Sequence, residues 1–267
     1  MLGKLLKYEW KATSRVFLPF YGAILIFAIV NRFFFMLNQG NVKTGGLLAI
    51  PSGLAMMVYV LAIAATFILT FVVMIQRYYK NLLGDEGYLM FTLPVTPRQN
   101  IVAKLLMSVA WEVISFLVVI LSLFAMLAQA DFFTKFGEVI TAFNNWDVNF
   151  NKNVFVAWMV AAVVVSLFTS ILYIYASISI GQLFTRHKLI ASFGAFIALN
   201  FVTQAVSSII MAIMYVVNPN GINIDESQLT TGLMSLFFGA VILLNLLFGI
   251  GYYIVSNVIL TKKLNLE

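Results

Sequence analysis

Residues 52–75 read SGLAMMVYVLAIAATFILTFVVMI, an apolar run that contains no Asp, Glu, Lys or Arg. A helix of about 20 mostly apolar residues crosses the hydrocarbon core of a bilayer, so this run predicts a transmembrane helix. Five further runs have the same character, at residues 17–37, 101–128, 154–184, 189–217 and 232–260. The sequence therefore predicts an all-α, polytopic membrane protein with six transmembrane helices in one domain over residues 1–267.

The composition of the chain agrees with this interpretation. Of its 267 residues, 62% are hydrophobic and 10% are charged, whereas soluble domains carry about 25% charged residues. The absence of cysteine excludes disulfides and thiol chemistry, and with His187 as the one histidine no His/Cys metal site is expected. The net charge of +6 follows membrane topology along the chain, so no nucleic-acid partner is expected.

Lys and Arg residues divide unequally between the two ends of the predicted spans. Cytoplasmic segments of membrane proteins carry the excess of these residues. Of the 16 Lys and Arg residues, all but four lie on one side, and the exceptions are Arg32, Lys43, Lys135 and Lys152. Both termini are therefore expected in the cytoplasm, which agrees with an even number of spans.

Residues 1–16 are expected to form a separate helix on the inner membrane surface. At about 100° per residue, Lys4, Lys7, Lys11 and Arg15 share one stripe, opposite a stripe of apolar residues. This pattern is typical of an interfacial helix bound to lipid. Glu9 projects from the apolar side and is expected to pair with a basic group of a cytoplasmic segment.

The outer loop, residues 129–153, is the longest connection between predicted spans. Apolar side chains recur in it at helical spacing, namely Phe132, Phe133, Phe136, Val139, Ile140 and Phe143. We expect a short amphipathic helix that rests on the outer leaflet.

The connection between the second and third spans, residues 77–100, contains the turn-rich stretch LGDEGYLMFTLPVTPRQ at 83–99. Asp85 is a good N-cap for a short helix, and Pro94 ends it. Thr96 and Gln99 then form a predicted capping box with Pro97 at the first helical position, which starts the next transmembrane helix.

The short helix of this stretch carries Tyr88 and Phe91 outside the membrane. The chain has no cytoplasmic domain that would cover these aromatic side chains. Exposed aromatic residues on a short rigid element suit insertion into a groove of another protein. The alternative is that the helix lies flat on lipid headgroups.

The segments GDEGYL at 84–89 and TLPV at 92–95, followed by Lys104, resemble the first cytoplasmic loop of ABC transporter permease subunits of the type-2 exporter superfamily. The start KLLKYEWKATSR is similar to the N-terminal elbow helix of that family. In the family this loop forms a coupling helix that docks on the ATPase subunit. The resemblance implies docking roles for Asp85, Glu86, Tyr88, Leu89, Phe91, Leu93 and Pro94.

The same resemblance implies partners and location. A second permease copy or a paralogue would complete a dimer in the bacterial cytoplasmic membrane. The chain lacks a G-x-x-x-x-G-K-[ST] loop, so ATP and Mg would be bound by the separate ATPase subunit and the chain itself is expected to be no enzyme. Cargo in this superfamily is typically amphipathic. The many aromatic residues favour a peptide, and the expectation is an exporter of antimicrobial or cytolytic peptides.

Polar residues inside predicted spans are candidates for the transport pathway, because such residues are costly in lipid. Glu112 is the one acid well inside a span. The other candidates, some of them at i, i+3, i+4 and i+7 on the fifth span, are Thr66, Thr70, Asn200, Thr203, Gln204 and Ser207. Contact with substrate and hydrogen bonding between helices both remain open for them.

Two other classes of function compete with an ATP-driven exporter. An ATP-independent secondary transporter or channel would need ionisable coupling residues in mid-membrane, and Glu112 is the only such residue. A membrane enzyme that acts on lipid would need a nucleophile and base, and the sequence offers no motif for them.

Overall fold

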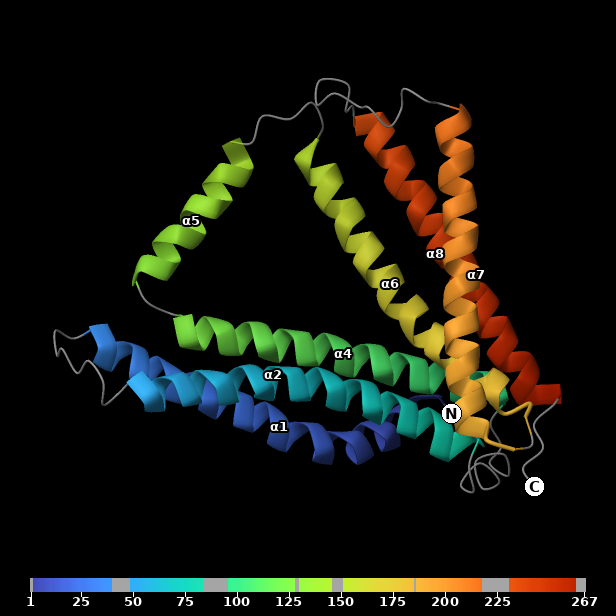
Figure 1. Cartoon of the computed structure of the whole chain (residues 1–267), viewed down its shortest axis with the longest axis horizontal. Coiled ribbons are helices and arrows are strands. Elements are labelled where there is room, and N and C mark those ends of the chain that lie inside the picture. The colour runs from blue at the N-terminus through green and yellow to red at the C-terminus, as the bar shows by residue number, and fades with distance from the viewer. Residues whose placement is uncertain are drawn as a thin grey trace. The chain divides into compact units, whose positions relative to one another are not determined.

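A computed structural model of the chain describes residues 2–39, 49–83, 96–127, 130–145, 151–184, 186–217 and 231–262. In these ranges the chain forms seven α-helices, one π-helical turn and no strand (Figure 1). The elements are α1 (Leu2–Gln39), α2 (Ala49–Tyr78), the π-helical turn η1 (Tyr79–Leu83), α4 (Pro97–Leu127), α5 (Ala130–Asn145), α6 (Lys152–Gly181), α7 (Lys188–Val217) and α8 (Thr231–Lys262). The predicted all-α class is confirmed.

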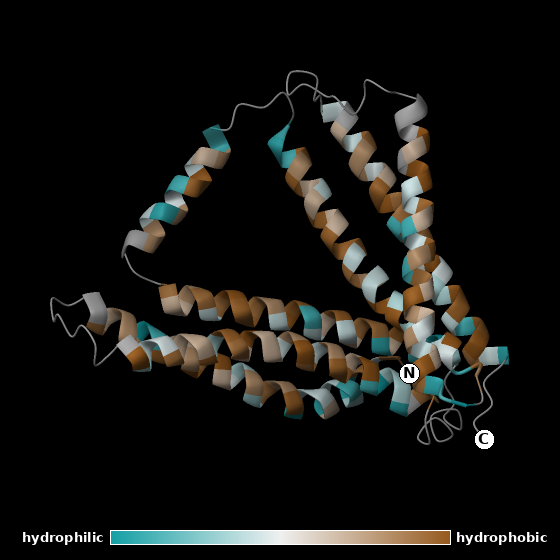
Figure 2. Cartoon of the chain, in the orientation of Figure 1, coloured by the Kyte–Doolittle hydropathy of each residue, from teal (hydrophilic) through white to brown (hydrophobic). Residues whose placement is uncertain are grey.

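Six of these helices are long and apolar enough to cross a membrane, and they are α1, α2, α4, α6, α7 and α8. Each coincides with one of the six predicted spans, so that prediction is confirmed. Figure 2 shows that apolar residues predominate on these helices apart from the first turns of α1, whereas polar and apolar residues alternate on α5. The chain is therefore a multi-pass membrane protein by the length and composition of its helices.

The N-terminal segment differs from the prediction, because α1 runs without a break from Leu2 to Gln39. No helix boundary separates residues 1–16 from the first span. No glycine or proline lies between Lys4 and Leu18, and Pro19 is accommodated inside the helix. Proline is tolerated in transmembrane helices, where neighbouring groups satisfy the freed backbone carbonyl.

The two predicted faces of this N-terminal segment are present. Lys4, Lys7, Lys11 and Arg15 are exposed, whereas Glu9 is buried at 8% relative exposure. The pairing of Glu9 with a basic group stays a prediction.

The start of α4 has the predicted capping box. The backbone N–H of Gln99 donates to Thr96 Oγ1 at 3.4 Å, and the backbone N–H of Thr96 donates to Gln99 Oε1 at 3.3 Å. These two bonds satisfy donors that a helix start leaves without intrahelical partners. The sequence therefore located the start of this helix correctly.

The amphipathic helix predicted for the outer loop is α5. Phe132 and Phe136 pack their rings against Phe124 of α4, with centroids 5.4 and 6.0 Å apart. Phe136 nevertheless stays partly open at 45% relative exposure, and further apolar side chains of α5 are exposed, namely Phe133, Val139, Ile140 and Phe143. An exposed apolar face on a short helix is consistent with contact to lipid.

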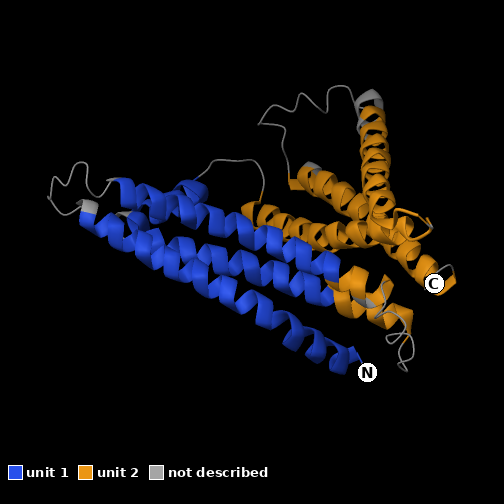
Figure 3. Cartoon of the chain, turned by 60° about the horizontal axis from the view of Figure 1, so that its bottom comes forward, with its two compact units in different colours: residues 1–76, 106–146 blue, residues 77–105, 147–267 orange. Residues whose placement is uncertain are grey.

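The chain divides into two compact units, which Figure 3 shows in separate colours. Unit 1 comprises residues 1–76 and 106–146, and unit 2 comprises residues 77–105 and 147–267. Both α2 and α4 therefore contribute residues to both units.

Within unit 1, α1 and α4 run parallel. Trp111 Nε1 donates to Thr13 Oγ1 at 2.7 Å, and the hydroxyls of Tyr21 and Ser115 form a hydrogen bond of 2.8 Å further along both helices. The indole of Trp111 also stacks on Phe17 at 4.5 Å, where it forms part of a buried aromatic cluster. Glu9 and Thr13, which belong to the segment expected to lie apart, are thus buried in this unit near Phe17.

Within unit 2, α6 and α8 run parallel, and α7 runs antiparallel to α6. Trp158 Nε1 donates to Ser235 Oγ at 3.1 Å, and Thr169 Oγ1 donates to the Asn245 carbonyl at 3.2 Å. Between α6 and α7 the pairing reverses, since the Tyr173 hydroxyl donates to the Phe196 carbonyl and Gly181 lies beside Ser192. Three successive membrane crossings would alternate in this way.

Candidate functional site: a polar groove between α6, α7 and α8

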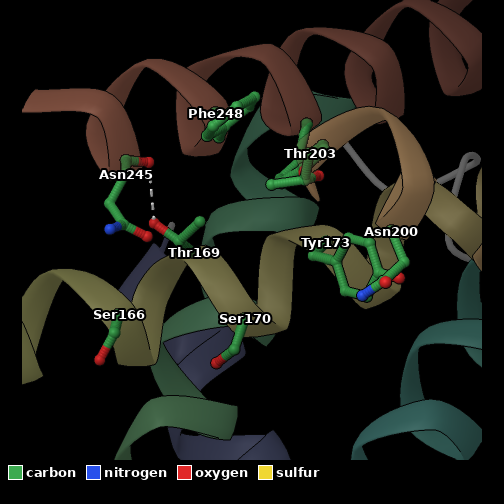
Figure 4. A pocket seen from close by; sticks show the side chains of 9 residues that line it. Ser166, Thr169, Ser170, Tyr173, Asn200, Thr203, Asn245 and Phe248 are labelled. Carbon is green, nitrogen blue, oxygen red and sulfur yellow. Dashed lines mark hydrogen bonds between the residues drawn. The ribbon is translucent and has the colours of Figure 1, made fainter. Parts of the chain in front are cut away.

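A polar cavity lies in unit 2 between three apolar helices. Its volume is about 280 Å³, and Figure 4 shows the side chains around it. The lining residues are Ser166, Thr169, Ser170 and Tyr173 of α6, Asn200 and Thr203 of α7, and Asn245, Phe248 and Tyr252 of α8. These residues lie near the middle of their helices, so the cavity is placed about halfway along the apolar spans.

A second cavity of about 260 Å³ adjoins the first and shares Thr203, Asn245 and Phe248 with it. Its remaining lining comes from α7 and α8 and is mostly apolar, namely Ser207, Ile210, Phe237, Ala240, Val241 and Leu244. The two cavities together form one groove, which we call the α6–α8 groove. Most of the surface in both cavities is apolar, but hydroxyl and amide side chains are concentrated around the first cavity, its polar end, and are fewer around the second, its apolar end.

Hydrogen bonds between helices fix the polar end of the groove. The hydroxyls of Thr203 and Tyr252 form a bond of 2.7 Å between α7 and α8. Thr169 and Asn245 face each other between α6 and α8 in Figure 4, where the dashed line marks the bond to the Asn245 carbonyl. The Tyr173 hydroxyl donates to the Phe196 carbonyl at 2.5 Å. Polar contacts therefore join all three helices around this cavity.

The side chains of the groove offer both hydrogen-bond donors and acceptors. Ser166 and Ser170 donate to carbonyls of their own helix at 2.8 and 3.0 Å, which leaves their oxygen lone pairs as acceptors. Asn245 Nδ2 donates to the Val241 carbonyl at 3.1 Å and keeps a second N–H. The groove can therefore satisfy a ligand group that both donates and accepts.

No lining residue of the groove carries a charged side chain. In the described ranges, moreover, no three His, Cys, Asp or Glu residues lie together as a metal site would require. Hydroxyls, amides and aromatic rings suit binding of an uncharged amphipathic molecule rather than metal chemistry.

The structure brings together three of the four polar residues predicted on the fifth span. Asn200 and Thr203 line the polar cavity, and Thr203 and Ser207 line the adjoining one. Gln204 is exposed and lines neither. The partner surfaces from α6 and α8 were not identified from the sequence.

A signal for the α6 surface was nevertheless present. Ser166, Thr169, Ser170 and Tyr173 have the same i, i+3, i+4, i+7 spacing as the stripe on α7. Asn245 is one of two amides in α8, the other being Asn257, and no spacing pattern connects it to further polar residues of that helix.

Thr66 and Thr70 lie elsewhere, in the interior of unit 1. Both are buried, at 0% and 3% relative exposure, and Thr66 donates to the carbonyl of Ala62. Thr70 donates to the carbonyl of Thr66 and forms a 2.9 Å bond with Ser115. Their hydroxyls thus take part in bonding within and between helices, and a role in the pathway stays a prediction.

Glu112 also belongs to unit 1, in the middle of α4. Its side chain is partly buried, and its Oε2 atom is buried without a hydrogen-bond partner among the described residues. A carboxyl oxygen without a partner in a membrane span is energetically costly. The functional role of Glu112 therefore stays a prediction.

Residues 84–95 lie outside the described residues. The predicted docking residues Asp85, Glu86, Tyr88, Leu89, Phe91, Leu93 and Pro94 therefore have no described position. The chain on both sides of them belongs to unit 2, with buried Leu82 and Leu83 before and the Thr96 cap after.

Comparison of the chain with protein-family models, curated proteins and solved structures finds no match. In its described residues the chain is all-helical, and six of its helices have the length and composition of membrane spans, as in a multi-pass membrane protein.

Proposed function

We propose that this chain is the transmembrane subunit of an ATP-driven exporter of the type-2 ABC superfamily. It would move an amphipathic substrate, in the first place a peptide, out across the bacterial cytoplasmic membrane. Its partners would be a separate ATPase subunit and a second permease copy or a paralogue.

The α6–α8 groove is the observation that carries this proposal. Hydroxyl and amide groups gather halfway along three apolar helices, beside a mostly apolar cavity. Secondary transporters bind substrate near the bilayer midplane, between helices, and the same placement suits the substrate site of an ATP-driven exporter. An amphipathic cargo matches a groove with one polar and one apolar end.

The chain around residues 84–95 supports the ATPase-docking part of the proposal. The end of α2 is fixed by Tyr78, whose hydroxyl bonds to Ser179 of α6 at 2.8 Å. The start of α4 is fixed by its capping box. Both flanks and the α6–α8 groove belong to unit 2, so a force applied to residues 84–95 would reach the helices that line the groove.

The proposed mechanism follows from this connection. ATP binding closes the partner subunits, the segment 84–95 moves with them, and the helices of unit 2 change the access to the groove. The chain itself supplies binding and motion, and the chemistry of ATP and Mg belongs to the partner.

The proposal includes both termini in the cytoplasm and the basic face of residues 1–16 at the inner membrane surface. The exposure of Lys4, Lys7, Lys11 and Arg15 supports contact with anionic lipid. Because the chain has no cysteine, single-cysteine variants at Lys7 and Thr261 can be labelled in sealed vesicles without background. Labelling of either from the outer side would contradict this orientation.

The ATPase that co-purifies with this chain from its native membrane can be identified and then co-expressed with the chain, which tests the function directly. The Tyr88→Ala/Phe91→Ala double variant should insert normally but lose the complex or its ATP hydrolysis. Ser208→Ala on α7, an exposed residue remote in sequence from the loop, is the control. Wild-type hydrolysis by the double variant would reject the docking role.

Glu112 keeps a second function open, an ATP-independent secondary transporter or channel. The buried Oε2 atom of Glu112 has no hydrogen-bond partner among the described residues. A carboxyl group that binds and releases a coupling proton would have such an oxygen free to accept it. Uptake or efflux driven by a proton gradient in vesicles without any ATPase, and abolished by Glu112→Gln, would favour this alternative.

A further inference from the structure

We propose that the α6–α8 groove binds an uncharged, extended stretch of peptide backbone and rejects ionised groups. This inference rests on the proposed function for the identity of the cargo as a peptide. It adds which part of the cargo is recognised and which residues recognise it.

The absence of charge in the lining determines the first half of the inference. Every polar group of the groove is a hydroxyl or an amide. An ionised ligand group placed there would lose its hydration without gaining an opposite charge, which is unfavourable in a membrane interior. A neutral amide that donates and accepts hydrogen bonds meets matching partners on all three helices.

The arrangement of these groups favours a linear ligand. Asn200, Thr203 and Ser207 follow one another along α7 and span about 10 Å of helix axis. An extended peptide advances about 3.3 Å per residue, so a stretch of about three residues would place its amides along this row. A compact sugar ring would reach only part of it.

The apolar end of the groove would bind the apolar side chains of the peptide. Ile210, Phe237 and Leu244 line the second cavity, next to Phe248, which the two cavities share. Backbone amides along the polar row and apolar side chains against these residues would satisfy both ends of the groove at once. The recognised stretch is therefore apolar in sequence and interior to the cargo, away from its charged termini.

Binding can be measured on the chain alone in lipid nanodiscs, without ATPase. The probe is dansyl-Leu-Phe-Leu-amide, which carries no charge, and its matched probes replace the central Phe by Asp or Lys. Empty nanodiscs correct for partition into lipid. We expect the neutral probe to bind at least tenfold more tightly than either charged probe.

Variants of the groove locate the site. Asn200→Leu and Asn245→Leu should each weaken the neutral probe at least fivefold, whereas Ser208→Leu, on the exposed side of α7, should not. Asn245→Asp should bind the Lys probe at least tenfold more tightly than the wild type does. This gain of binding cannot arise from misfolding, so it keeps the test decisive where a Leu variant is unstable.

Three outcomes would overturn the inference. The first is equal affinity for the neutral and charged probes, and the second is stronger binding of octyl glucoside than of the neutral peptide. The third is disulfide cross-linking of Thr203→Cys between two copies in the absence of probe, because another subunit would then fill the groove. Loss of peptide binding by a chain whose ATPase coupling is normal contradicts this inference alone. Normal peptide binding by a chain that forms no complex with any ATPase contradicts the exporter alone.

Discussion

The ring of Tyr78, at the end of α2, stacks on the ring of Tyr175 in α6 with centroids 3.9 Å apart and planes within 9° of parallel. Both side chains are buried, at 0% and 1% relative exposure. Six residues further along the chain begins the segment proposed to dock on the ATPase, and two residues before Tyr175 lies Tyr173 of the groove. This stack therefore connects the proposed docking segment to the proposed substrate site within unit 2.

Replacement of Tyr78 tests that connection. Tyr78→Ala should destabilise the protein by about 3–5 kcal/mol, as large-to-small changes of buried aromatic residues do. Tyr78→Phe keeps the stack and loses the 2.8 Å bond to Ser179, so its cost should be about 0.5–1.5 kcal/mol. Unfolding of the chain in mixed micelles with increasing dodecyl sulfate measures both.

Ser179→Ala and the Tyr78→Phe/Ser179→Ala double variant complete the cycle. If the bond is formed, the double variant should cost less than the sum of the two single variants. Strict additivity would show that the hydroxyls do not interact.

Continuity of α1 gives a second prediction. Trp111 Nε1 donates to Thr13 Oγ1 at 2.7 Å, and Trp111 also stacks on Trp10 at 4.6 Å. Thr13→Val should leave a buried indole N–H without a partner and cost about 1–3 kcal/mol in free energy of unfolding. Ser14→Ala is the matched control, because the Ser14 hydroxyl donates to the Lys11 carbonyl of its own helix, and it should cost under about 0.5 kcal/mol. A separate surface helix at residues 1–16 would instead make both substitutions neutral.

Six spans, α5 and the cap at Thr96 could be predicted because their signals are local. A capping box, an amphipathic spacing and an apolar run each lie within one continuous stretch of sequence, so each can be recognised without knowledge of the tertiary contacts. The unbroken α1 could not be predicted, because the sequence of residues 1–16 has the same basic and apolar stripes whether the segment lies on lipid or packs against Trp111. Only the contact with Trp111, 98 residues away from Thr13 along the chain, distinguishes the two arrangements.

The groove was predictable in part for a similar reason. A row such as Asn200, Thr203 and Ser207 stands out by its amide in an apolar helix. Hydroxyls such as Ser166 and Ser170 attract less notice, because serine can satisfy itself on its own helix, as both do here. Which helices face one another depends on contacts between residues far apart in sequence, such as Thr169 and Asn245.

Glu112 gives a third prediction, on activity. Glu112→Gln keeps the size of the side chain and removes its ionisable group, so insertion, assembly and stability should stay within about 0.5 kcal/mol of the wild type or improve. Substrate-stimulated ATP hydrolysis should change at least threefold if the carboxyl faces the pathway. Comparison of basal and stimulated hydrolysis in nanodiscs checks this, and unchanged stimulation would assign Glu112 to helix packing alone.

Gly181 gives the fourth prediction, on the approach of α6 to α7. A Cβ atom at Gly181 would lie 2.5 Å from the backbone nitrogen and 2.6 Å from the Cα of Ser192, closer than non-bonded atoms approach. Because backbone atoms block the space, Gly181→Ala should force the two helix ends apart and cost about 1–3 kcal/mol. The hydrogen bond from Ser192 Oγ to the Lys188 carbonyl, 2.9 Å long, lies in the same contact.

Gly194→Ala on α7 is the control, since a Cβ there would meet nothing within 4 Å. It should leave stability unchanged or raise it by up to about 1 kcal/mol, because alanine favours a helix over glycine. Thermal unfolding of the two variants side by side separates steric overlap from helix propensity. Equal melting temperatures would mean that α6 and α7 do not approach closely at Gly181. The distance between these two helices at the groove would then be set by other contacts.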